Sequence, residues 1–283
     1  MSAASDRSAV VPSLSHVRGY VFDIDGTLAL ADRRLSGYQA LPGACELLAL
    51  LRERNLPYVA FTNGSTKTPR QLSQALTEIG IEVTEQQALT PVSVAVDLFK
   101  RRRYRRLLVL GGEGVWQPLV EAGFDVVRSP ERADDADAVL IGWHPGFVLA
   151  DLDAACRAVW AGAALYTVST APYVATRDGR TLGISGALSA AVRSITGKRA
   201  VVVGKPSAQA LACASARLGV AAADLAIVGD DPSLENTMAL RGGALSVGVH
   251  TGLSRAGDFA RLPVNGRPHF SLSGVDRLLE MLA

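Results

Sequence analysis

A chain of 283 residues, almost half of them hydrophobic, has enough apolar material for one large domain or two smaller ones. Its formal net charge of +2 argues against the strong overall field of a protein that binds nucleic acid or an anionic membrane. No stretch approaches the roughly 20 apolar residues that a membrane-spanning helix needs, and the Ser- and Ala-rich amino terminus lacks the apolar segment of a signal peptide.

The three cysteines, at positions 45, 156 and 213, are scattered and match no metal-binding spacing. Such cysteines are typical of a reducing compartment rather than of a disulfide framework. The basic run at residues 100–106 lacks the interleaved aromatic residues and broad basic face of a nucleic-acid site. We therefore expect a cytoplasmic protein with no nucleic-acid or membrane partner.

Residues 19–28 form a short apolar run that ends in Asp23 and Asp25 and then breaks at a glycine. Buried parallel strands read as continuous apolar runs, and the i, i+2 spacing would place both carboxylates on one side of such a strand. Two like charges this close need a cation or a shared proton. The alternative is a turn in which the aspartates bond nearby amides. The preceding strand and the following Gly-Thr favour a catalytic site.

Beyond this strand, helical and strand patterns alternate along the chain. Helices are expected over residues 44–54, 68–79, 92–103, 115–122, 151–161 and 187–195. Strands are expected over residues 57–61, 107–110, 138–141, 165–168, 200–203 and 225–228. Thr68 is the expected cap of the second helix, with Pro69 at its first position. This alternation predicts parallel sheets covered by helices.

Two further strand ends carry groups suited to phosphate. Thr62, Asn63 and Gly64 follow the strand at 57–61, and a hydroxyl with backbone amides can bond phosphoryl oxygens, although the same residues are also ordinary turn formers. Lys205 follows the strand at 200–203 in a Gly-Lys-Pro-Ser sequence that is not a Walker loop. A lysine at that position could neutralise both Asp23 and an incoming phosphate.

A third strand end is acidic. Asp230 and Asp231 come directly after the strand at 225–228, and Glu235 follows closely. A hard divalent cation such as Mg²⁺ prefers oxygen ligands of this kind. The strand end is therefore a candidate metal site.

In type and order these segments resemble the four motifs of the haloacid dehalogenase superfamily, whose phosphatases read Asp-x-Asp-Gly-Thr in the first. The resemblance implies that Asp23 is the nucleophile and Asp25 the general acid and base. It also implies that Thr62 and Lys205 bind phosphoryl oxygens. The chemistry is sound in itself, because a carboxylate can divide ester hydrolysis into two displacements through an aspartyl-phosphate. A second carboxyl can protonate the leaving alkoxide and later activate water.

The same resemblance implies Mg²⁺ as the cofactor. Its ligands would be the side chains of Asp23 and Asp230 and the backbone carbonyl of Asp25. Many relatives read Gly-Asp-x-x-x-Thr-Asp in the fourth motif, where this chain has Leu-Glu. Asp231 and Glu235 are therefore alternative candidates to complete the metal site.

The wide gap between the second and third motifs resembles the inserted cap of the class IIA, 4-nitrophenylphosphatase-like branch. We predict an α/β fold with a Rossmann-like core of parallel strands, formed by residues 1–90 and 198–283. Residues 91–197 are predicted to form an inserted α/β cap domain, with the ligand held between the two. The resemblance also leaves open a homodimer formed through the cap.

The predicted activity is the Mg²⁺-dependent hydrolysis of a small phosphorylated metabolite. Phosphoglycolate, glycerol phosphate, sugar phosphates and nucleoside monophosphates are candidate substrates implied by the resemblance. A phosphotransferase or mutase that uses the same aspartyl-phosphate is an alternative. A catalytically weak regulatory protein that binds a phosphometabolite is another, although it would not need a nucleophile and a proton shuttle.

The predicted cap departs from its relatives where we expect specificity to be decided. His144 lies where relatives often read Leu-Asp, and residues 167–172 read Thr-Val-Ser-Thr-Ala-Pro in place of Thr-Asn-Pro-Asp. Changing the polar groups of a binding site changes which substrate hydroxyls can be satisfied. We therefore expect residues 143–147 and 169–173, with His144 and Tyr173 in particular, to contact the substrate. For His144 the alternative is a packed or turn histidine.

Overall fold

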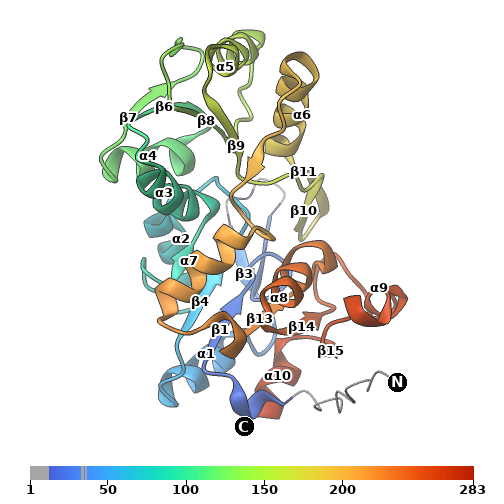
Figure 1. Cartoon of the computed structure of the whole chain (residues 1–283). Coiled ribbons are helices and arrows are strands. Elements are labelled where there is room, and N and C mark those ends of the chain that lie inside the picture. The colour runs from blue at the N-terminus through green and yellow to red at the C-terminus, as the bar shows by residue number, and fades with distance from the viewer. Residues whose placement is uncertain (1–12, 33–34, 36) are drawn as a thin grey trace, which may run out of the picture.

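The computed structural model describes residues 13–32, 35 and 37–283 and contains two separate parallel sheets (Figure 1). The first, which we call the core sheet, has the strand order β15-β14-β13-β1-β4-β5. Its strands are β1 (Gly19–Phe22), β4 (Tyr58–Phe61), β5 (Ala88–Leu89), β13 (Leu225–Gly229), β14 (Leu245–Val249) and β15 (Phe270–Leu272). The amino-terminal segment 1–12, in which the sequence predicts no signal peptide, lies outside the described residues.

The second sheet, which we call the cap sheet, has the strand order β12-β9-β8-β6-β7. Its strands are β6 (Arg106–Leu110), β7 (Asp125–Arg128), β8 (Ala138–Ile141), β9 (Ala164–Thr167) and β12 (Val201–Val202). The predicted α/β fold, a parallel core sheet with a separate inserted parallel sheet, is confirmed.

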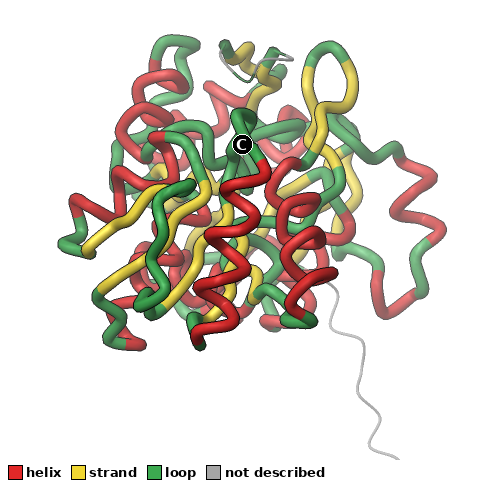
Figure 2. The backbone as a smooth tube through the Cα atoms, turned by 90° about the horizontal axis from the view of Figure 1, so that it is seen from above, coloured by secondary structure: helices red, strands yellow, loops and turns green. Residues whose placement is uncertain are grey.

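Helices lie around the strands of both sheets, as the view in Figure 2 shows. Those of the chain segments that form the core sheet are α1 (Ala44–Glu53), α2 (Pro69–Thr77), α7 (Ala208–Leu218), α8 (Thr237–Gly242), α9 (Ala256–Arg261) and α10 (Val275–Leu282). The others are α3 (Pro91–Arg102), α4 (Glu113–Glu121), α5 (Leu149–Ala161) and α6 (Ile184–Thr196). Thr68 caps α2 as predicted, accepting from the backbone of Gln71 while the Gln71 side chain accepts from the backbone of Thr68. No helix in the described ranges is both long and apolar enough to cross a membrane.

Strand β1 is apolar throughout because both of its faces are covered. Tyr20 and Phe22 point into one hydrophobic cluster, whereas Val21 points into another on the opposite face. All four residues of the strand are buried. The continuous apolar run in the sequence is thus the signature of a central strand.

The two sheets share one of these clusters. It runs from Val21 and Val59 of the core sheet, through residues of α3 and α7, to Leu107 and Leu140 of the cap sheet. Helices α3 and α7 pack against each other between the sheets. On this side of the molecule the cap sheet is therefore held to the core by a continuous apolar interior.

Two short hairpins, which the sequence did not reveal, join the halves elsewhere. One is β2 (Ala29–Ala31) with β3 (Tyr38–Ala40), and the other is β10 (Tyr173–Thr176) with β11 (Gly179–Leu182). The backbone N–H of Arg177 donates to the carbonyl of Ala31 at 2.9 Å, and β10 lies against β2. The two hairpins therefore contact each other across the gap between core and cap.

One strand lies in a different sheet from the one that the predicted division implies. We placed residues 198–283 in the core, but Val201 and Val202 pair with Tyr166 and Thr167 of β9. The cap sheet consequently extends beyond residue 197, and the chain returns to the core only after β12. The pairing depends on a strand 35 residues away in sequence, which a local pattern does not contain.

Candidate active site

Three of the four predicted motifs meet because their strands are neighbours in the core sheet. Strand β1 lies between β13 and β4, and all three run parallel. Phe22 pairs with Val228 on one side and with Ala60 on the other. The residues after these strands, Asp23, Thr62 and Asp230, therefore emerge at the same carboxyl edge, which is where open α/β sheets bind ligands.

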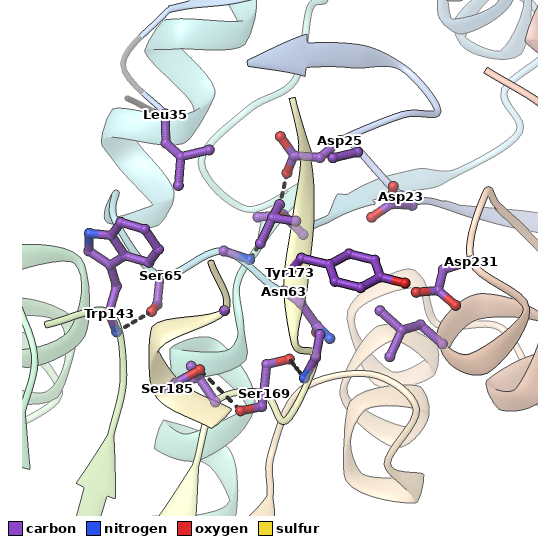
Figure 3. A pocket seen from close by; sticks show the side chains of 18 of the residues that line it. Asp23, Asp25, Leu35, Asn63, Ser65, Trp143, Ser169, Tyr173, Ser185 and Asp231 are labelled. Atoms are coloured by element: carbon purple, nitrogen blue, oxygen red, sulfur yellow. Dashed lines mark hydrogen bonds between the residues drawn. The ribbon is translucent and has the colours of Figure 1, made fainter. Parts of the chain in front are cut away.

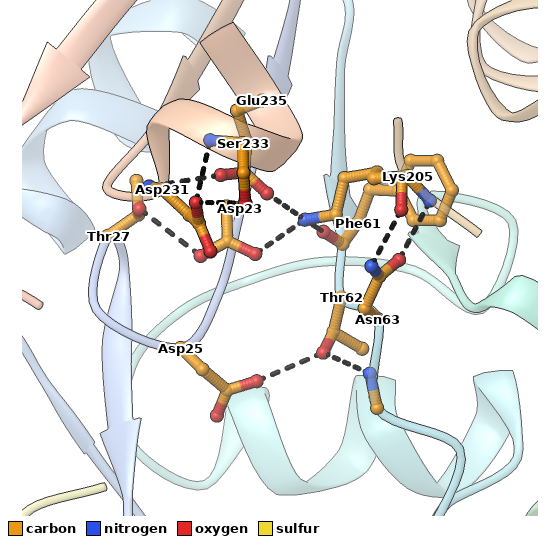
Figure 4. A network of polar contacts seen from close by, with 11 residues as sticks. Asp23, Asp25, Thr27, Phe61, Thr62, Asn63, Lys205, Asp231, Ser233 and Glu235 are labelled. Atoms are coloured by element: carbon orange, nitrogen blue, oxygen red, sulfur yellow. Dashed lines mark hydrogen bonds and ion pairs between the residues drawn. The ribbon is translucent and has the colours of Figure 1, made fainter. Parts of the chain in front are cut away.

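Asp23 is buried and paired with a lysine (Figure 4). Its Oδ1 lies 2.5 Å from Nζ of Lys205, and Thr27 donates its hydroxyl to Oδ2 at 3.3 Å. The backbone N–H of Asp23 donates to the carbonyl of Val228, which continues the pairing of β1 with β13. The carboxylate is thus fixed in position while one side chain neutralises it.

Lys205 is 1% exposed, and its ammonium group contacts three oxygen atoms. Besides Asp23, Nζ contacts Oε1 of Glu235 at 2.7 Å and donates to the carbonyl of Phe61 at 2.5 Å. Burial by itself would lower the pKa of this lysine, but the carboxylates of Asp23 and Glu235 outweigh it and raise the pKa. Lys205 therefore stays charged beside the predicted nucleophile.

The Asn63 side chain bonds the backbone of Lys205. Its Nδ2 donates to the carbonyl of Lys205 at 3.0 Å, and its Oδ1 accepts from the N–H of Lys205 at 2.8 Å. We predicted that Asn63 and Gly64 bind phosphate. In the structure the Asn63 side chain bonds the backbone of Lys205, and the N–H of Gly64 donates to Oγ1 of Thr62 at 2.8 Å. Both residues line the same cavity as Asp23, so their binding of phosphate stays a prediction.

Asp25 has a different environment from Asp23. Its Oδ2 accepts the hydroxyl of Thr62 at 2.9 Å, whereas its buried Oδ1 has no hydrogen-bond partner among the described residues. Burial, with a smaller contribution from the charge of Asp23, raises the pKa of Asp25 to about 7. A carboxyl group with this pKa can hold a proton and release it near neutral pH.

The acidic fourth motif continues from β13 into a π-helical turn, η3 (Pro232–Asn236). Asp230 and Glu235 are each 2% exposed, and burial raises the pKa of both carboxyl groups, that of Glu235 to about 7. Gly229 is required here because a Cβ at its position would lie 2.1 Å from Cγ of Glu235. The wide turn and the glycine together let Glu235 reach inward to Lys205.

The two alternative metal ligands that the sequence suggested, Asp231 and Glu235, both line the cavity and both have protein partners. Glu235 pairs with Lys205 through Oε1 and accepts from the backbone of Asp231 through Oε2, at 3.2 Å. Oδ1 of Asp231 accepts from the N–H and the hydroxyl of Ser233, at 2.7 and 2.6 Å, and so begins the π-helical turn. Within the described ranges, the Asp230 side chain accepts a hydrogen bond from the N–H of Leu253.

The donor set left at this edge fits a hard divalent cation. Asp23 and Asp230 supply carboxylate oxygens, and their mutual charge contributes to the raised pKa of Asp230. Gly26, whose φ is +107°, would place a Cβ 2.6 Å from Oδ2 of Asp230, so the close approach of these two loops requires glycine. No group of three His, Cys, Asp or Glu side chains capable of holding a metal occurs in the described ranges. Here a cation would therefore need main-chain carbonyls or water in addition to the carboxylates.

These groups form one end of a cavity of about 820 Å³, counting space open to solvent (Figure 3). Asp23, Asp25, Thr62 and Asp230 line the core end. The other end is lined by residues of the cap and of the hairpins, namely Leu35, Tyr38, Trp143, Val168, Ser169, Ala171, Tyr173, Val174, Ala175, Gly183, Ile184 and Ser185. The cavity thus opens from the predicted nucleophile toward the cap.

The two residues that we predicted to decide specificity, His144 and Tyr173, lie differently relative to the cavity. Tyr173 lines the cavity, whereas His144 does not. The His144 side chain is 19% exposed, and its Nε2 lies 3.3 Å from Oδ2 of the buried Asp151, with an edge contact to Phe147. Its neighbour Trp143 lines the cavity instead and donates its backbone N–H to the hydroxyl of Ser65 at 3.0 Å.

Sequence reasoning missed Tyr38 and did not single out Trp143. Tyr38 lies on β3, a strand of only three residues, and its pKa is raised by burial and by the charges of Asp25 and Asp23. The available signal was slight: one aromatic residue in a polar segment, and a tryptophan beside a more conspicuous histidine.

The arrangement of a paired carboxylate, a proton-holding carboxyl group and a buried lysine at one strand edge defines a phosphatase-type hydrolase. A family model described as haloacid dehalogenase-like hydrolase matches residues 20–125, and a second, HAD-hydrolase-like model matches residues 202–278. The chain belongs to the haloacid dehalogenase-like hydrolases, in the branch of NagD and the 4-nitrophenyl phosphatases.

Three relatives illustrate the likeness. The 5'-nucleotidase YutF of Bacillus subtilis is 27% identical, over 84% of this chain and 89% of its own length. NagD from E. coli K-12 is 25% identical with a TM-score of 0.81, covering 92% of this chain and 97% of that structure. The glycerol phosphate phosphatase from Mycobacterium tuberculosis, solved in complex with magnesium, is 26% identical with a TM-score of 0.81, covering 95% of this chain and 77% of its own.

Proposed function

We propose that this protein hydrolyses a small phosphate monoester in a Mg²⁺-dependent reaction through a phosphorylated Asp23. The observation that carries the proposal is the contrast between two neighbouring carboxyl groups. Asp23 is paired with a buried lysine, whereas Asp25 forms no ion pair with a described residue and has a pKa of about 7. Two carboxyl groups in environments this different are suited to separate roles as nucleophile and as acid and base.

In the first step, the carboxylate of Asp23 attacks phosphorus while the bond from phosphorus to the ester oxygen breaks. Asp25 gives its proton to the departing oxygen, so the products are a free alcohol, an aspartyl-phosphate and the Asp25 carboxylate. Thr62 orients Asp25 through the hydrogen bond to its Oδ2. Lys205, held by Glu235 and the Phe61 carbonyl, supplies positive charge beside the transferring group.

In the second step, the Asp25 carboxylate takes a proton from water as the water oxygen attacks phosphorus. The bond to Asp23 breaks, which releases inorganic phosphate, and both carboxyl groups return to their starting states. Asp23, Asp230 and the backbone carbonyl of Asp25 would hold Mg²⁺, whose charge would offset that of the phosphoryl oxygens and carboxylates.

The substrate is a small phosphorylated metabolite. Supporting this, the relatives named above include a 5'-nucleotidase and a glycerol phosphate phosphatase. We also infer that residues 91–202 form the cap, which extends the predicted boundary at 197 to include β12, and that the rest forms the core. This division matches the pairing of β12 with β9 and leaves all the proposed reacting groups in the core.

Release of inorganic phosphate from a panel of phosphometabolites, measured with Mg²⁺ and with EDTA, tests the proposed reaction. We expect Mg²⁺-dependent release together with a transient phosphoenzyme that is absent from Asp23→Asn. Transfer of the phosphoryl group to an added sugar in place of water would identify a phosphotransferase. Stoichiometric binding without release would indicate a regulatory protein.

A homodimer through the cap is also a proposal. It is supported by two large exposed hydrophobic residues on neighbouring cap helices, Trp160 of α5 at 62% and Ile195 of α6 at 47% exposure. Analytical ultracentrifugation of the wild type and of Trp160→Glu would test it, with a monomeric wild type contradicting the proposal.

A further inference from the structure

A second lysine lies beside the cavity and has no role in the proposed reaction. Lys67 is partly buried, and its ammonium group donates to the backbone carbonyl of Leu35 at 2.5 Å. The same Nζ lies 5.4 Å from the centroid of the Tyr38 ring. Both partners line the cavity, whereas Lys67 is not among its lining residues. Lys67 therefore contacts the cavity wall without forming part of it.

Leu35 has a backbone conformation that a leucine rarely adopts. Its φ is +58°, in the left-handed region, where a Cβ crowds the following carbonyl oxygen. In Figure 3 its side chain points into the cavity from the side on which Trp143 also lies. Residues in such conformations persist only where their surroundings fix them. The hydrogen bond from Lys67 to the Leu35 carbonyl is one contact that does so.

Tyr38 brings the same wall close to the reacting carboxyl groups. Burial raises the pKa of its hydroxyl, and the charges of Asp25 and Asp23 raise it further. The ammonium group of Lys67 lies over the ring, whose negative face attracts a cation. Burial lowers the pKa of Lys67, so this cation has lost part of its hydration and depends on its protein partners. The lysine and the ring therefore hold each other in place.

The backbone of Lys67 is fixed by the cap. A Cβ on Gly114, at the start of α4, would lie 2.6 Å from the backbone nitrogen of Lys67 and 2.6 Å from the carbonyl oxygen of Ser65. The hydroxyl of Ser65 in turn accepts from the backbone of Trp143. The cap thus packs directly on the loop that carries Lys67. Through its side chain, this one residue connects the cap, the loop after β4 and the β2–β3 hairpin.

We propose that Lys67 is a positioning residue, which holds Leu35 and Tyr38 in the cavity wall where they contact the leaving group of the substrate. The proposal rests on the proposed phosphatase reaction and adds a residue that determines how well its substrates bind. Lys67 acts through Leu35 and Tyr38, because these two line the cavity and the lysine does not. Inorganic phosphate has no leaving group, so its binding at the core end should not depend on Lys67.

Kinetics of Lys67→Met with 4-nitrophenyl phosphate and glycerol phosphate test the proposal, with inorganic phosphate as the competing inhibitor. Methionine keeps most of the length of the side chain but lacks its charge and its N–H donors. We expect KM for both esters to rise about 10-fold, whereas Ki for inorganic phosphate should stay constant within about 2-fold. A lysine that serves only the fold would lower the fraction of active enzyme, and hence kcat, with KM unchanged. That result, or an equal rise in KM and Ki, would overturn the proposal.

Further variants assign the effect to the wall. Tyr38→Leu leaves Lys67 in place and should raise KM by itself, so it tests the wall even where Lys67→Met does not fold. Combined with Lys67→Met, its effect should be less than additive, because both changes act on one wall. Tyr173→Leu, on the other hairpin, should add to Lys67→Met in full. Additive effects of Lys67→Met and Tyr38→Leu, or an unchanged KM in Tyr38→Leu, would contradict the assignment.

Two control variants complete the series. Lys67→Arg keeps the charge and the N–H donors and should recover part of the lost affinity. Lys100→Met removes an exposed lysine at the end of α3, outside the cavity lining, and should leave KM unchanged. A rise in KM as large in Lys67→Arg as in Lys67→Met, or the same rise in Lys100→Met, would overturn the proposal.

A binding measurement separates this proposal from the proposed reaction. Calorimetric titration with phenylphosphonate and with inorganic phosphate, in the presence of Mg²⁺, needs no turnover. Weaker binding of phenylphosphonate but not of phosphate to Lys67→Met, with no phosphate release from any ester by the wild type, would support the positioning role and refute the reaction. Phosphate release by the wild type, with both ligands binding Lys67→Met as they bind the wild type, would refute the positioning role alone.

Discussion

At the core end of the cavity the side chains are charged, buried and bonded to one another. At the cap end most are aromatic or aliphatic, and the hydroxyls of Ser169 and Ser185 bond backbone groups. The single ammonium group of Lys205 contacts Asp23, Glu235 and the Phe61 carbonyl. Trp143 and Tyr173, by contrast, reach the cavity from a loop and from a short hairpin. Ion pairs and hydrogen bonds therefore organise the core end of the cavity, whereas apolar packing organises the cap end.

This difference separates the reaction from the choice of substrate. The core end is assembled from the ends of neighbouring strands, whose positions are fixed by pairing and by two buried clusters. Any phosphate monoester presents the same phosphoryl group to it. Only the cap end meets the part of the molecule that distinguishes one substrate from another.

The largest effect should come from removing the proposed nucleophile. Asp23→Asn should lower kcat by about 10⁴-fold or more, because an amide does not attack phosphorus and no aspartyl-phosphate can form. The fold should persist, since the amide keeps the shape of the carboxylate. Phosphate release and circular dichroism check both expectations. Asp153→Asn, at an exposed acid on α5, is the matched control, and near-native activity of Asp23→Asn would refute the assignment.

Loss of the buried cation should damage both fold and activity. Lys205→Met leaves Asp23 and Glu235 buried without their counter-charge, which should lower the free energy of unfolding by about 3–5 kcal/mol in metal-free protein. Adding Glu235→Gln removes one of the uncompensated charges. The double variant should therefore recover part of the stability in urea titrations but none of the activity. Recovery of activity would mean that Lys205 serves only the fold.

The role of Asp25 should depend on the leaving group. Asp25→Asn should lower the hydrolysis of alkyl phosphates by about 10²–10⁴-fold, because an alkoxide must be protonated as it leaves. The first step with 4-nitrophenyl phosphate should suffer less, since nitrophenolate needs no proton. Phosphoenzyme should accumulate because the base for the second step is missing, which acid quenching and mass spectrometry detect. An equal loss for both substrates with no phosphoenzyme would assign Asp25 another function.

The metal-free protein should lose stability as the pH rises, and Mg²⁺ should oppose this loss. The raised pKa values of Asp25 and Glu235, each about 7, mean that the metal-free native state keeps protons that unfolded carboxyl groups release near pH 4. The native state binds more protons than the unfolded state in this window, so the free energy of unfolding falls as the pH rises from about 4 to about 7.

Asp230 is a proposed Mg²⁺ ligand, and burial raises its pKa well above the usual range, so a proton and Mg²⁺ compete for it. The increase in Tm caused by Mg²⁺ should therefore be larger at pH 8 than at pH 5.5. Differential scanning fluorimetry at both pH values, with Mg²⁺ or EDTA, measures it. Asp23→Asn should show a smaller increase because it has lost one proposed ligand. A Tm that does not respond to Mg²⁺ at pH 8 would argue against a metal site.

The smallest effect on specificity should come from His144. Because its ring contacts Asp151 and Phe147 rather than the cavity, His144→Ala should change the ranking of substrates less than Tyr173→Ala does. It should lower the free energy of unfolding by about 1–3 kcal/mol, since the ring's contacts with Asp151 and Phe147 are lost. Substrate ranking by kcat/KM and urea titration test both parts. A ranking altered more by His144→Ala would place the histidine in the binding site.

Local patterns in the sequence were enough to predict the fold class and the reacting groups. Apolar runs that end in polar residues marked β1, β4 and β13, and parallel strands deliver such residues to one edge, so the sequence alone groups Asp23, Thr62 and Asp230 in one site. The residues that form an element and end it are close in sequence, as the capping box of Thr68 and Gln71 shows. Short stretches of chain therefore contain the information for this level of prediction.

The partners that those groups take depend instead on the tertiary structure. Asn63 bonds the backbone of Lys205 across 142 positions of sequence, Glu235 forms an ion pair with the same lysine, and β12 joins the cap sheet. Likewise, Trp143 rather than His144 lines the cavity. The direction of a side chain at the end of a strand is set by contacts with segments far away in the chain, and these contacts leave no periodicity in the sequence.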